Sequence, residues 1–169
     1  MAIEAALAEE LTRLQNSNYR FLALLGYDGE LDLALLNVKN RIRRISLLED
    51  VLIRHPKLRI YVMHFGSPFV DDMIALLYSY PQVYVDVAQN DWGFPRKHFH
   101  SQLRRLVDAG FGKRIVFGSD QMIWPDTIAL AIETIESADF LTVEQKRDIF
   151  YNNAARFLRL DEKDRARVF

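Results

Sequence analysis

Four short apolar runs alternate with longer helical patterns along this chain of 169 residues. Turn-forming residues such as glycine and proline bound the runs, as expected for short buried strands. The runs are Arg20–Leu25, Leu58–Met63, Val83–Ala88 and Arg114–Phe117. Alternation of strand and helix favours parallel strands joined by right-handed crossovers, so we expect an α/β fold.

The segments around these runs place apolar residues at helical spacing. The expected helices are Ala2–Leu14, Leu31–Arg54, Asp71–Tyr80, His98–Ala109, Ile128–Ile135 and Val143–Leu160. Asp126 or Thr127 is a candidate N-cap, and Thr142 with Gln145 resembles a capping box. A closed (β/α)8 barrel needs eight strands and typically about 250 residues. We therefore expect a single domain over residues 1–169, either an open four-stranded sheet or half of a TIM barrel.

The amino-acid composition and net charge limit the classes of function that the chain can have. Half of the residues are hydrophobic and the formal net charge is −1, which gives no support for binding nucleic acid or an anionic membrane surface. The absence of cysteine excludes disulfides, thiolate metal sites and a cysteine nucleophile. No apolar run approaches the roughly 20 residues of a membrane span. The first residues are acidic and amphipathic, unlike a signal peptide, so we expect a cytoplasmic protein.

Polar side chains gather where the predicted strands end. His64 follows the second strand, Asp86 lies in the third, and Asp120 follows the fourth in the segment RIVFGSD. Ligands of α/β proteins bind at this edge, and a histidine with a carboxylate can share a metal ion or form an acid–base pair. Structural alternatives stay open: a backbone-bonded histidine for His64, an internal ion pair or loop-amide acceptor for Asp86, and a cap or turn for Asp120.

Two tryptophans and three further histidines are weaker candidates. Trp92 and Trp124 lie in loops after strands, where they line a pocket or cover the rim of the core. His98 and His100 lie two apart on a helix, so they point in different directions and are expected at the surface. His55 is expected at a helix end. The chain has no glycine-rich phosphate loop and no Gly-x-Ser-x-Gly motif, so a hydrolase serine is unsupported.

Five motifs occur in a fixed order over roughly residues 47–160. They are HPKLRI (55–60), MHFGSP (63–68), YPQVYVD (80–86), RIVFGSD (114–120) and NNAARFL (152–158). In order and spacing they resemble the C-terminal half of the amidohydrolase-related family. That family belongs to the metal-dependent amidohydrolase superfamily and includes aminocarboxymuconate-semialdehyde-type decarboxylases and lactone hydrolases. The resemblance implies a distorted TIM barrel with its site at the strand ends.

The resemblance also implies roles for individual residues. Asp120 matches the carboxylate after the last strand, which is a metal ligand and helps to deprotonate the attacking water. His64 matches the histidine after the sixth strand, a catalytic residue close to the metal. Asp120 and His64 are therefore the predicted catalytic and metal-binding residues, and zinc or manganese is the implied cofactor. From their positions after or within the strands, and not from the resemblance, Trp92, Trp124 and Asp86 are the predicted substrate contacts.

The chain departs from the family pattern in its metal ligands. Members begin with a strand carrying His-x-His, two ligands, and carry a further histidine after the fifth strand. His98-Phe99-His100 has the first spacing, but it falls in a predicted helix late in the chain. Gly26-Tyr27-Asp28 follows the first apolar run without a histidine. Three of the usual four metal ligands are thus absent from this sequence.

Two hypotheses follow. In the first, the chain is part of an enzyme whose first half is missing here, and which hydrolyses or decarboxylates a small carboxylate, lactone or amide through a metal-activated water. In the second, it is a catalytically degenerate half-barrel that acts as a binding or interaction protein. A four-stranded sheet leaves two open edges, which predicts a homo-oligomer or pairing with a missing half-barrel. The other expected partner is a small-molecule substrate, with no nucleic acid and no membrane.

Overall fold

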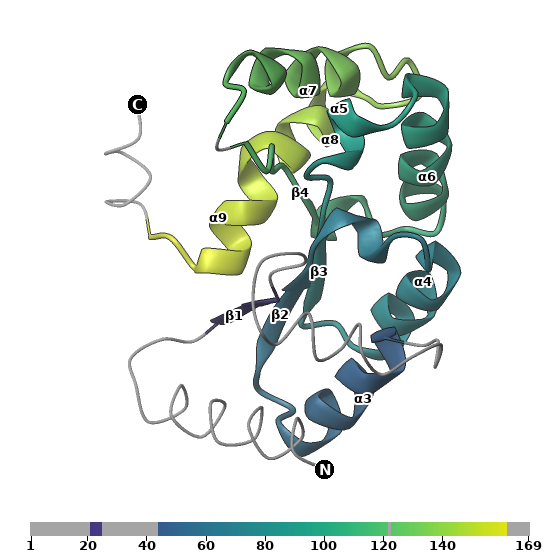
Figure 1. Ribbon diagram of the computed structural model, residues 1–169. Coiled ribbons are helices and arrows are strands. Elements are labelled where there is room, and N and C mark those ends of the chain that lie inside the picture. The colour runs from purple at the N-terminus through teal and green to yellow at the C-terminus, as the bar shows by residue number, and fades with distance from the viewer. Residues whose placement is uncertain (1–20, 25–43, 122, 162–169) are drawn as a thin grey trace.

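A computed structural model describes residues 21–24, 44–121 and 123–161 (Figure 1). In this part of the chain, four parallel strands form one sheet in the order β1-β2-β3-β4. They are β1 (Phe21–Leu24), β2 (Arg59–Val62), β3 (Val83–Asp86) and β4 (Ile115–Val116). The prediction of four parallel strands is confirmed, and each strand is shorter than the apolar run that indicated it.

Helices connect consecutive strands, so each parallel pair is joined by a crossover. The helices up to β4 are α3 (Arg44–Arg54), the 3-10 turn η1 (His64–Gly66), α4 (Val70–Ser79), α5 (Asn90–Gly93), α6 (Arg96–Asp108) and the 3-10 turn η2 (Gly112–Arg114). Those after β4 are α7 (Asp126–Glu136), α8 (Val143–Arg147), the π-helical segment η3 (Asp148–Asn152) and α9 (Asn153–Leu158). Figure 1 shows α3, α4 and α6 along one side of the sheet. Predicted helices Ala2–Leu14 and the first part of Leu31–Arg54 lie outside the described residues.

The core lies between the sheet and the helices of that side. Ile60, Val83 and Ile115 on three neighbouring strands are completely buried. The helices add apolar residues three or four positions apart, which places them on one helical face. These residues are Met73 and Leu77 of α4 and Phe99, Leu103 and Leu106 of α6. Fully burying one such side chain stabilises the fold by roughly 1.5–3 kcal/mol, so this layer anchors the strands whose ends form the site.

The C-terminal helix differs from the single helix predicted over Val143–Leu160. The predicted capping box is confirmed, because the Thr142 hydroxyl accepts from the Gln145 backbone N–H at 3.1 Å and the Gln145 side-chain carbonyl accepts from the Thr142 N–H at 2.8 Å. The helix then widens into η3 before α9 begins. A π turn is rare, and spacing rules based on 3.6 residues per turn of an α-helix do not predict it.

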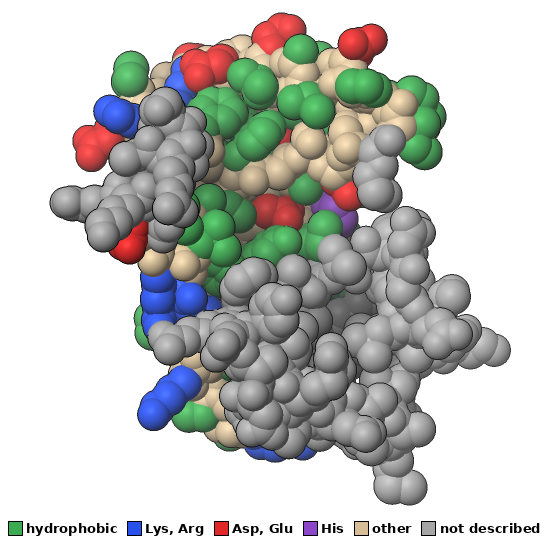
Figure 2. Space-filling view, turned by 90° about the vertical axis from the view of Figure 1, so that its left-hand side faces the viewer, with side chains coloured by type: hydrophobic (Ala, Val, Ile, Leu, Met, Phe, Trp, Pro, Cys, Tyr) green, Lys and Arg blue, Asp and Glu red, His purple; other side chains and the backbone are tan. Residues whose placement is uncertain are grey.

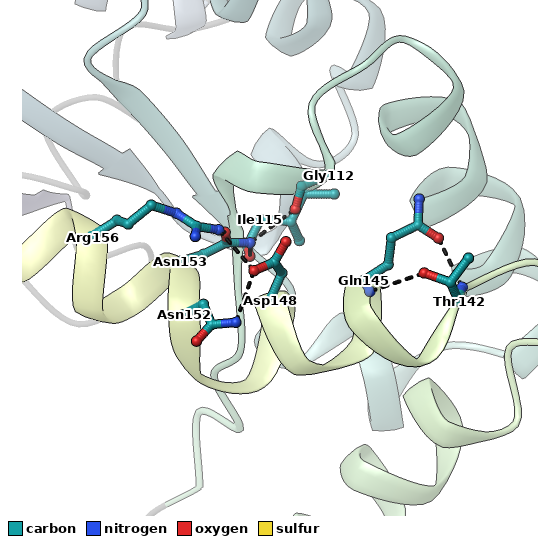
Figure 3. Close-up of polar contacts among 8 residues, drawn as sticks. All are labelled: Gly112, Ile115, Thr142, Gln145, Asp148, Asn152, Asn153 and Arg156. Atoms are coloured by element: carbon teal, nitrogen blue, oxygen red, sulfur yellow. Dashed lines mark hydrogen bonds and ion pairs between the residues drawn. The ribbon is translucent and has the colours of Figure 1, made fainter. Parts of the chain in front are cut away.

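Polar side chains around η3 tie this helix to β4 (Figure 3). The Asn153 amide donates to the carbonyl oxygens of Ile115 at 2.6 Å and Gly112 at 2.9 Å. The Asp148 carboxylate accepts from Asn152 at 3.0 Å and from Arg156 at 2.9 Å. Asn153 is completely buried, so its amide satisfies carbonyl groups that water does not reach.

Two further details concern helix starts and length. The N-cap prediction for α7 is wrong: Pro125 occupies that position, and the Thr127 hydroxyl donates to the Trp124 carbonyl instead of accepting from the helix. Proline has φ of −55° here, which is already suited to a helix start.

Among the described helices, none is long and apolar enough to span a membrane.

Candidate active site

The parallel sheet brings the predicted catalytic residues to one edge. His64 begins η1 just beyond β2, and Asp120 lies four residues beyond the end of β4. Their side chains approach each other, with His64 Nε2 3.9 Å from Asp120 Oδ2. Figure 2 shows a recess on one face of the molecule in which acidic side chains and a histidine side chain lie among hydrophobic ones. The structure therefore places together the two residues that the sequence singled out most strongly.

Three hydrogen bonds hold His64 in place. Its backbone N–H donates to Asp86 Oδ1 at 2.7 Å, and its carbonyl accepts from the Asn90 side-chain amide at 2.7 Å. Its ring Nδ1 lies 2.7 Å from the Ala88 carbonyl oxygen. Since a carbonyl oxygen only accepts, Nδ1 carries a proton, and Nε2 is the nitrogen that holds the lone pair whenever the ring is neutral. The described residues offer no hydrogen-bond partner to that buried Nε2, which faces Asp120.

The backbone at this edge is strained. His64, Phe65, Gln89 and Asp120 all have φ between 52° and 61°, the left-handed region that residues with a Cβ rarely adopt. In the described segments, the other non-glycine residue with positive φ is Arg159, which ends α9. Each such conformation costs about 1–3 kcal/mol and persists only when its surroundings impose it. Strain is thus concentrated in the three loops that form the candidate site.

The Asp86 carboxylate forms hydrogen bonds with the backbone of these loops. It is 4% exposed, and its Oδ1 accepts from the backbone N–H groups of His64 at 2.7 Å and Ala88 at 3.1 Å. Burial raises the pKa of Asp86 from 3.8 to about 6, although the bonds and charge of His64 oppose the rise, and the Asp120 charge adds to it. The structure shows the loop-amide acceptor that the sequence left open for Asp86, and its contact with substrate stays a prediction.

Close packing beneath the site also depends on a glycine. A Cβ at Gly118 would lie 3.1 Å from Ala88 Cβ, which is too close for comfortable contact. Gly118 precedes Asp120 by two residues, so the loop carrying the carboxylate passes directly over the end of β3. This approach explains why a glycine ends the fourth apolar run.

Asp91 is a candidate that the sequence analysis missed. It lies in α5, just beyond β3, is 1% exposed, and has no hydrogen-bond partner for either carboxylate oxygen within the described part of the chain. Burial is the main cause that raises its pKa from 3.8 to about 7, and the charges of Asp86 and Asp120 add to it. The N–H groups of Asp91 and Trp92 oppose the rise without reaching hydrogen-bond geometry. Its position after a strand was the available signal, but loop carboxylates are usually solvated.

The two tryptophans differ in their surroundings. Trp92 is half-buried, and its indole Nε1–H donates to the Ser119 carbonyl at 2.7 Å, next to Asp120. Trp124 is 60% exposed and lies in the loop before α7. Trp124 belongs to the loop that carries Asp120, and its backbone N–H donates to Gln121 Oε1 at 3.2 Å, whereas Trp92 reaches this loop from α5. Their predicted contacts with substrate stay predictions.

The remaining histidines lie away from the pair formed by His64 and Asp120. His98 is exposed, as predicted. His100 is half-buried, so its expected surface position is wrong: its ring bonds the Thr134 carbonyl at 2.8 Å and packs edge-on against Phe140. α6 turns this face toward the segment around α7, a packing that helical spacing alone does not specify. His55 directly follows α3, which confirms its predicted place at a helix end.

Comparisons with known proteins identify the family and the fold of the chain. The sequence matches the family described as Amidohydrolase over residues 34–160. The chain belongs to the amidohydrolase family. No curated protein sequence gives a match. Family membership confirms the resemblance carried by the five motifs, and the matched residues include β2, β3 and β4.

Solved structures show the same fold at low sequence identity. They include an uncharacterized TIM-barrel protein from Bordetella bronchiseptica, with 16% identity, a TM-score of 0.59, and coverage of 93% of this chain and 63% of that one. A zinc-bound amidohydrolase from Burkholderia multivorans has 19% identity, a TM-score of 0.55, and coverage of 92% and 69%. A manganese-bound dihydroxybenzoic acid decarboxylase from Polaromonas sp. JS666 has 12% identity, a TM-score of 0.55, and coverage of 93% and 66%. The chain is thus a partial TIM barrel that spans 63 to 69% of the length of these three structures.

The residues present fit part of an amidohydrolase metal centre. Imidazole nitrogen and carboxylate oxygen are ligands of both zinc and manganese, and His64 Nε2 and Asp120 offer one of each. Metal-binding histidines characteristically donate their other ring N–H to a carbonyl or carboxylate, as His64 Nδ1 does to Ala88. Within the described residues, no group of three or more ligating side chains is arranged to hold an ion. Catalytic zinc takes about three protein ligands, so this pair accounts for two.

Proposed function

We propose that this chain carries part of the active site of a metal-dependent enzyme that hydrolyses or decarboxylates a small carboxylate, lactone or amide. The observation that carries the proposal is the buried His64 Nε2, which has no hydrogen-bond partner among described residues and lies 3.9 Å from Asp120. Family membership supports the class of reaction. Relatives with zinc or manganese bound, one of them a decarboxylase, support the class of cofactor.

His64 and Asp120 would hold the divalent ion. When bound, such an ion supplies Lewis-acid chemistry, lowering the pKa of water and polarising a carbonyl group. Asp120 is 34% exposed on its side chain, so its carboxylate is accessible to a water molecule and can accept the proton that the water loses. The Nδ1–H bond to Ala88 prevents the His64 ring from flipping, so Nε2 keeps facing the reacting groups.

Metal binding tests the proposal directly. Titration calorimetry of the purified chain with zinc or manganese is expected to show one site. His64→Asn and Asp120→Asn should each lower the affinity about tenfold or more, the usual effect of disturbing a metal site. His98→Asn and Asp108→Asn are matched controls, because both residues are exposed and lie on α6. No binding by the wild-type chain, or equal losses in the controls, would contradict the proposal.

Turnover separates the enzyme from the degenerate half-barrel. With the metal bound, the chain should release carbon dioxide from a dihydroxybenzoate or hydrolyse a simple lactone, and Asp120→Asn should abolish the activity. A dihydroxybenzoate is the first substrate to test, because the manganese-bound structure is named as a dihydroxybenzoic acid decarboxylase. A chain that binds metal and ligand without turnover would instead favour the binding protein.

A further inference from the structure

The short helix α5 lies between the two loops that carry His64 and Asp120. Its first residue, Asn90, donates its side-chain amide to the His64 carbonyl at 2.7 Å. Its third residue, Trp92, donates its indole N–H to the Ser119 carbonyl at 2.7 Å. These two bonds connect one turn of helix to both halves of the candidate site.

We infer that Asn90 and Trp92 are positioning residues that set the separation of the His64 ring and the Asp120 carboxylate. The inference deepens the proposed function, on which its metal-binding consequence rests. It concerns how the site is built, and its structural part can be tested whether or not the chain binds a metal.

The topology of the sheet makes this role possible. β3 lies between β2 and β4, so the loop that follows β3 is adjacent to the loops that follow both neighbours. Successive residues of a helix are rotated by about 100°, so residues two apart point in nearly opposite directions. In α5 that rotation sends the Asn90 side chain toward the His64 loop and the Trp92 side chain toward the Asp120 loop.

The loops need an external support of this kind. His64 and Asp120 both adopt left-handed backbone conformations, with φ of 59° and 52°. Such conformations persist only where the surroundings impose them. The bond from Asn90 reaches the carbonyl of His64 itself, and the bond from Trp92 reaches the carbonyl of Ser119, one residue before Asp120. Each of these two hydrogen bonds therefore acts at or next to a strained residue.

Burial makes it hard for water to replace the hydrogen bond that Asn90 forms. Asn90 is 1% exposed, so water does not readily substitute for its amide. The single turn of α5 is closed by the Gly93 N–H, which donates to the Gln89 carbonyl at 2.6 Å. Loss of either hydrogen bond should let the His64 loop or the Asp120 loop relax while the other stays in place. The distance between the His64 ring and the Asp120 carboxylate would then change.

Trp92→Phe is the test variant, because it retains an aromatic ring and removes the N–H donor. The chain has two tryptophans, and Trp124→Phe is the matched control, since Trp124 is 60% exposed. The two variants also assign the two indole N–H signals in the NMR spectrum. We expect the Trp92 indole proton to exchange with solvent at least tenfold more slowly than that of Trp124.

A double-mutant cycle then reports on positioning. In the wild-type background, Asp120→Asn should move the ring resonances of His64, because the two side chains face each other. In the Trp92→Phe background the same change should move them by less than half as much, and in Trp124→Phe by the full amount. An undiminished effect in a folded Trp92→Phe protein would overturn the inference. Melting curves establish that each variant is folded. Asn90→Leu, which removes the hydrogen bond to the His64 carbonyl, is tested in the same cycle.

Zinc affinity provides a second readout. Trp92→Phe and Asn90→Leu should each weaken binding at least fivefold, and His98→Asn, at an exposed position of α6, should change it less than twofold. Unchanged affinity in folded Trp92→Phe and Asn90→Leu proteins would contradict a positioning role. If the wild-type chain binds no zinc, the proposed function fails, whereas the NMR cycle still decides the positioning role.

Discussion

Asp91→Asn should stabilise the protein in neutral and alkaline solution but not in acid. Asp91 is buried without a hydrogen-bond partner in the described structure, and its pKa is raised from 3.8 to about 7. The folded protein therefore holds the Asp91 proton more tightly than the unfolded chain does. Under linkage, stability falls as pH rises from about 4 to about 7, and the carboxylate is fully destabilising above that range.

The size of the effect follows from the same pKa change. One pKa unit corresponds to about 1.4 kcal/mol, so the rise at Asp91 corresponds to an upper limit of about 4 kcal/mol. Asparagine has nearly the same shape and no charge, so it removes this pH-dependent cost. Its buried amide adds a cost of its own, but that cost does not vary with pH. The quantity to compare is therefore the difference between variant and wild type at pH 8 and at pH 4.

Urea unfolding at several pH values measures this difference. We expect Asp91→Asn to gain about 2–4 kcal/mol relative to wild type between pH 4 and pH 8, with most of the change between pH 5 and pH 7. Asp108→Asn serves as the control, because Asp108 is exposed and its replacement should give no comparable trend. Asp86 titrates in both proteins, so its contribution largely cancels. A difference that stays constant from pH 4 to pH 8 would refute the assignment of Asp91 as a buried, unpaired carboxyl group.

Three further predictions concern the support of the site and the edges of the sheet. Gly118→Ala should destabilise by about 1–3 kcal/mol in urea unfolding because its Cβ would meet Ala88, whereas Gly112→Ala, with open space around it, should not; equal effects would contradict this. Asn153→Ala should cost about 1–3 kcal/mol by the same assay, since it leaves the Gly112 and Ile115 carbonyls unpaired, and a neutral change would refute that role. Sedimentation should show the self-association that the sequence predicts for a four-stranded sheet with two edges, and a stable monomer would contradict it.

The positions of the strands could be predicted from the sequence because their signal is local. Runs such as Leu58–Met63 and Arg114–Phe117 are short, apolar and bounded by turn residues, and the structure places β2 and β4 within them. The same signal located the candidate site. Once parallel strands are expected, the residues that follow them must share an edge, so His64 and Asp120 could be paired without knowing any distance.

Other features depend on contacts between distant segments. His100 is bonded to Thr134, and Asn153 is bonded to Ile115, so their burial follows from how α6, α7 and α9 pack. Asp91 was missed for the same reason. Nothing in its neighbours along the chain distinguishes a carboxylate buried beneath a site from one in an ordinary solvated loop.

The sequence by itself determined the α/β class, the family and the sheet edge that carries the candidate site residues, because these depend on periodicity and on the order of motifs along the chain. Only the tertiary structure decided that Nε2 of His64 is the ring nitrogen without a hydrogen-bond partner among the described residues, that it faces Asp120 at 3.9 Å, and that Asn90 and Trp92 bond the two loops. The physical reason is that a hydrogen bond depends on distances of a few tenths of an ångström between segments far apart in the chain. Those distances are set by the packing of the whole domain.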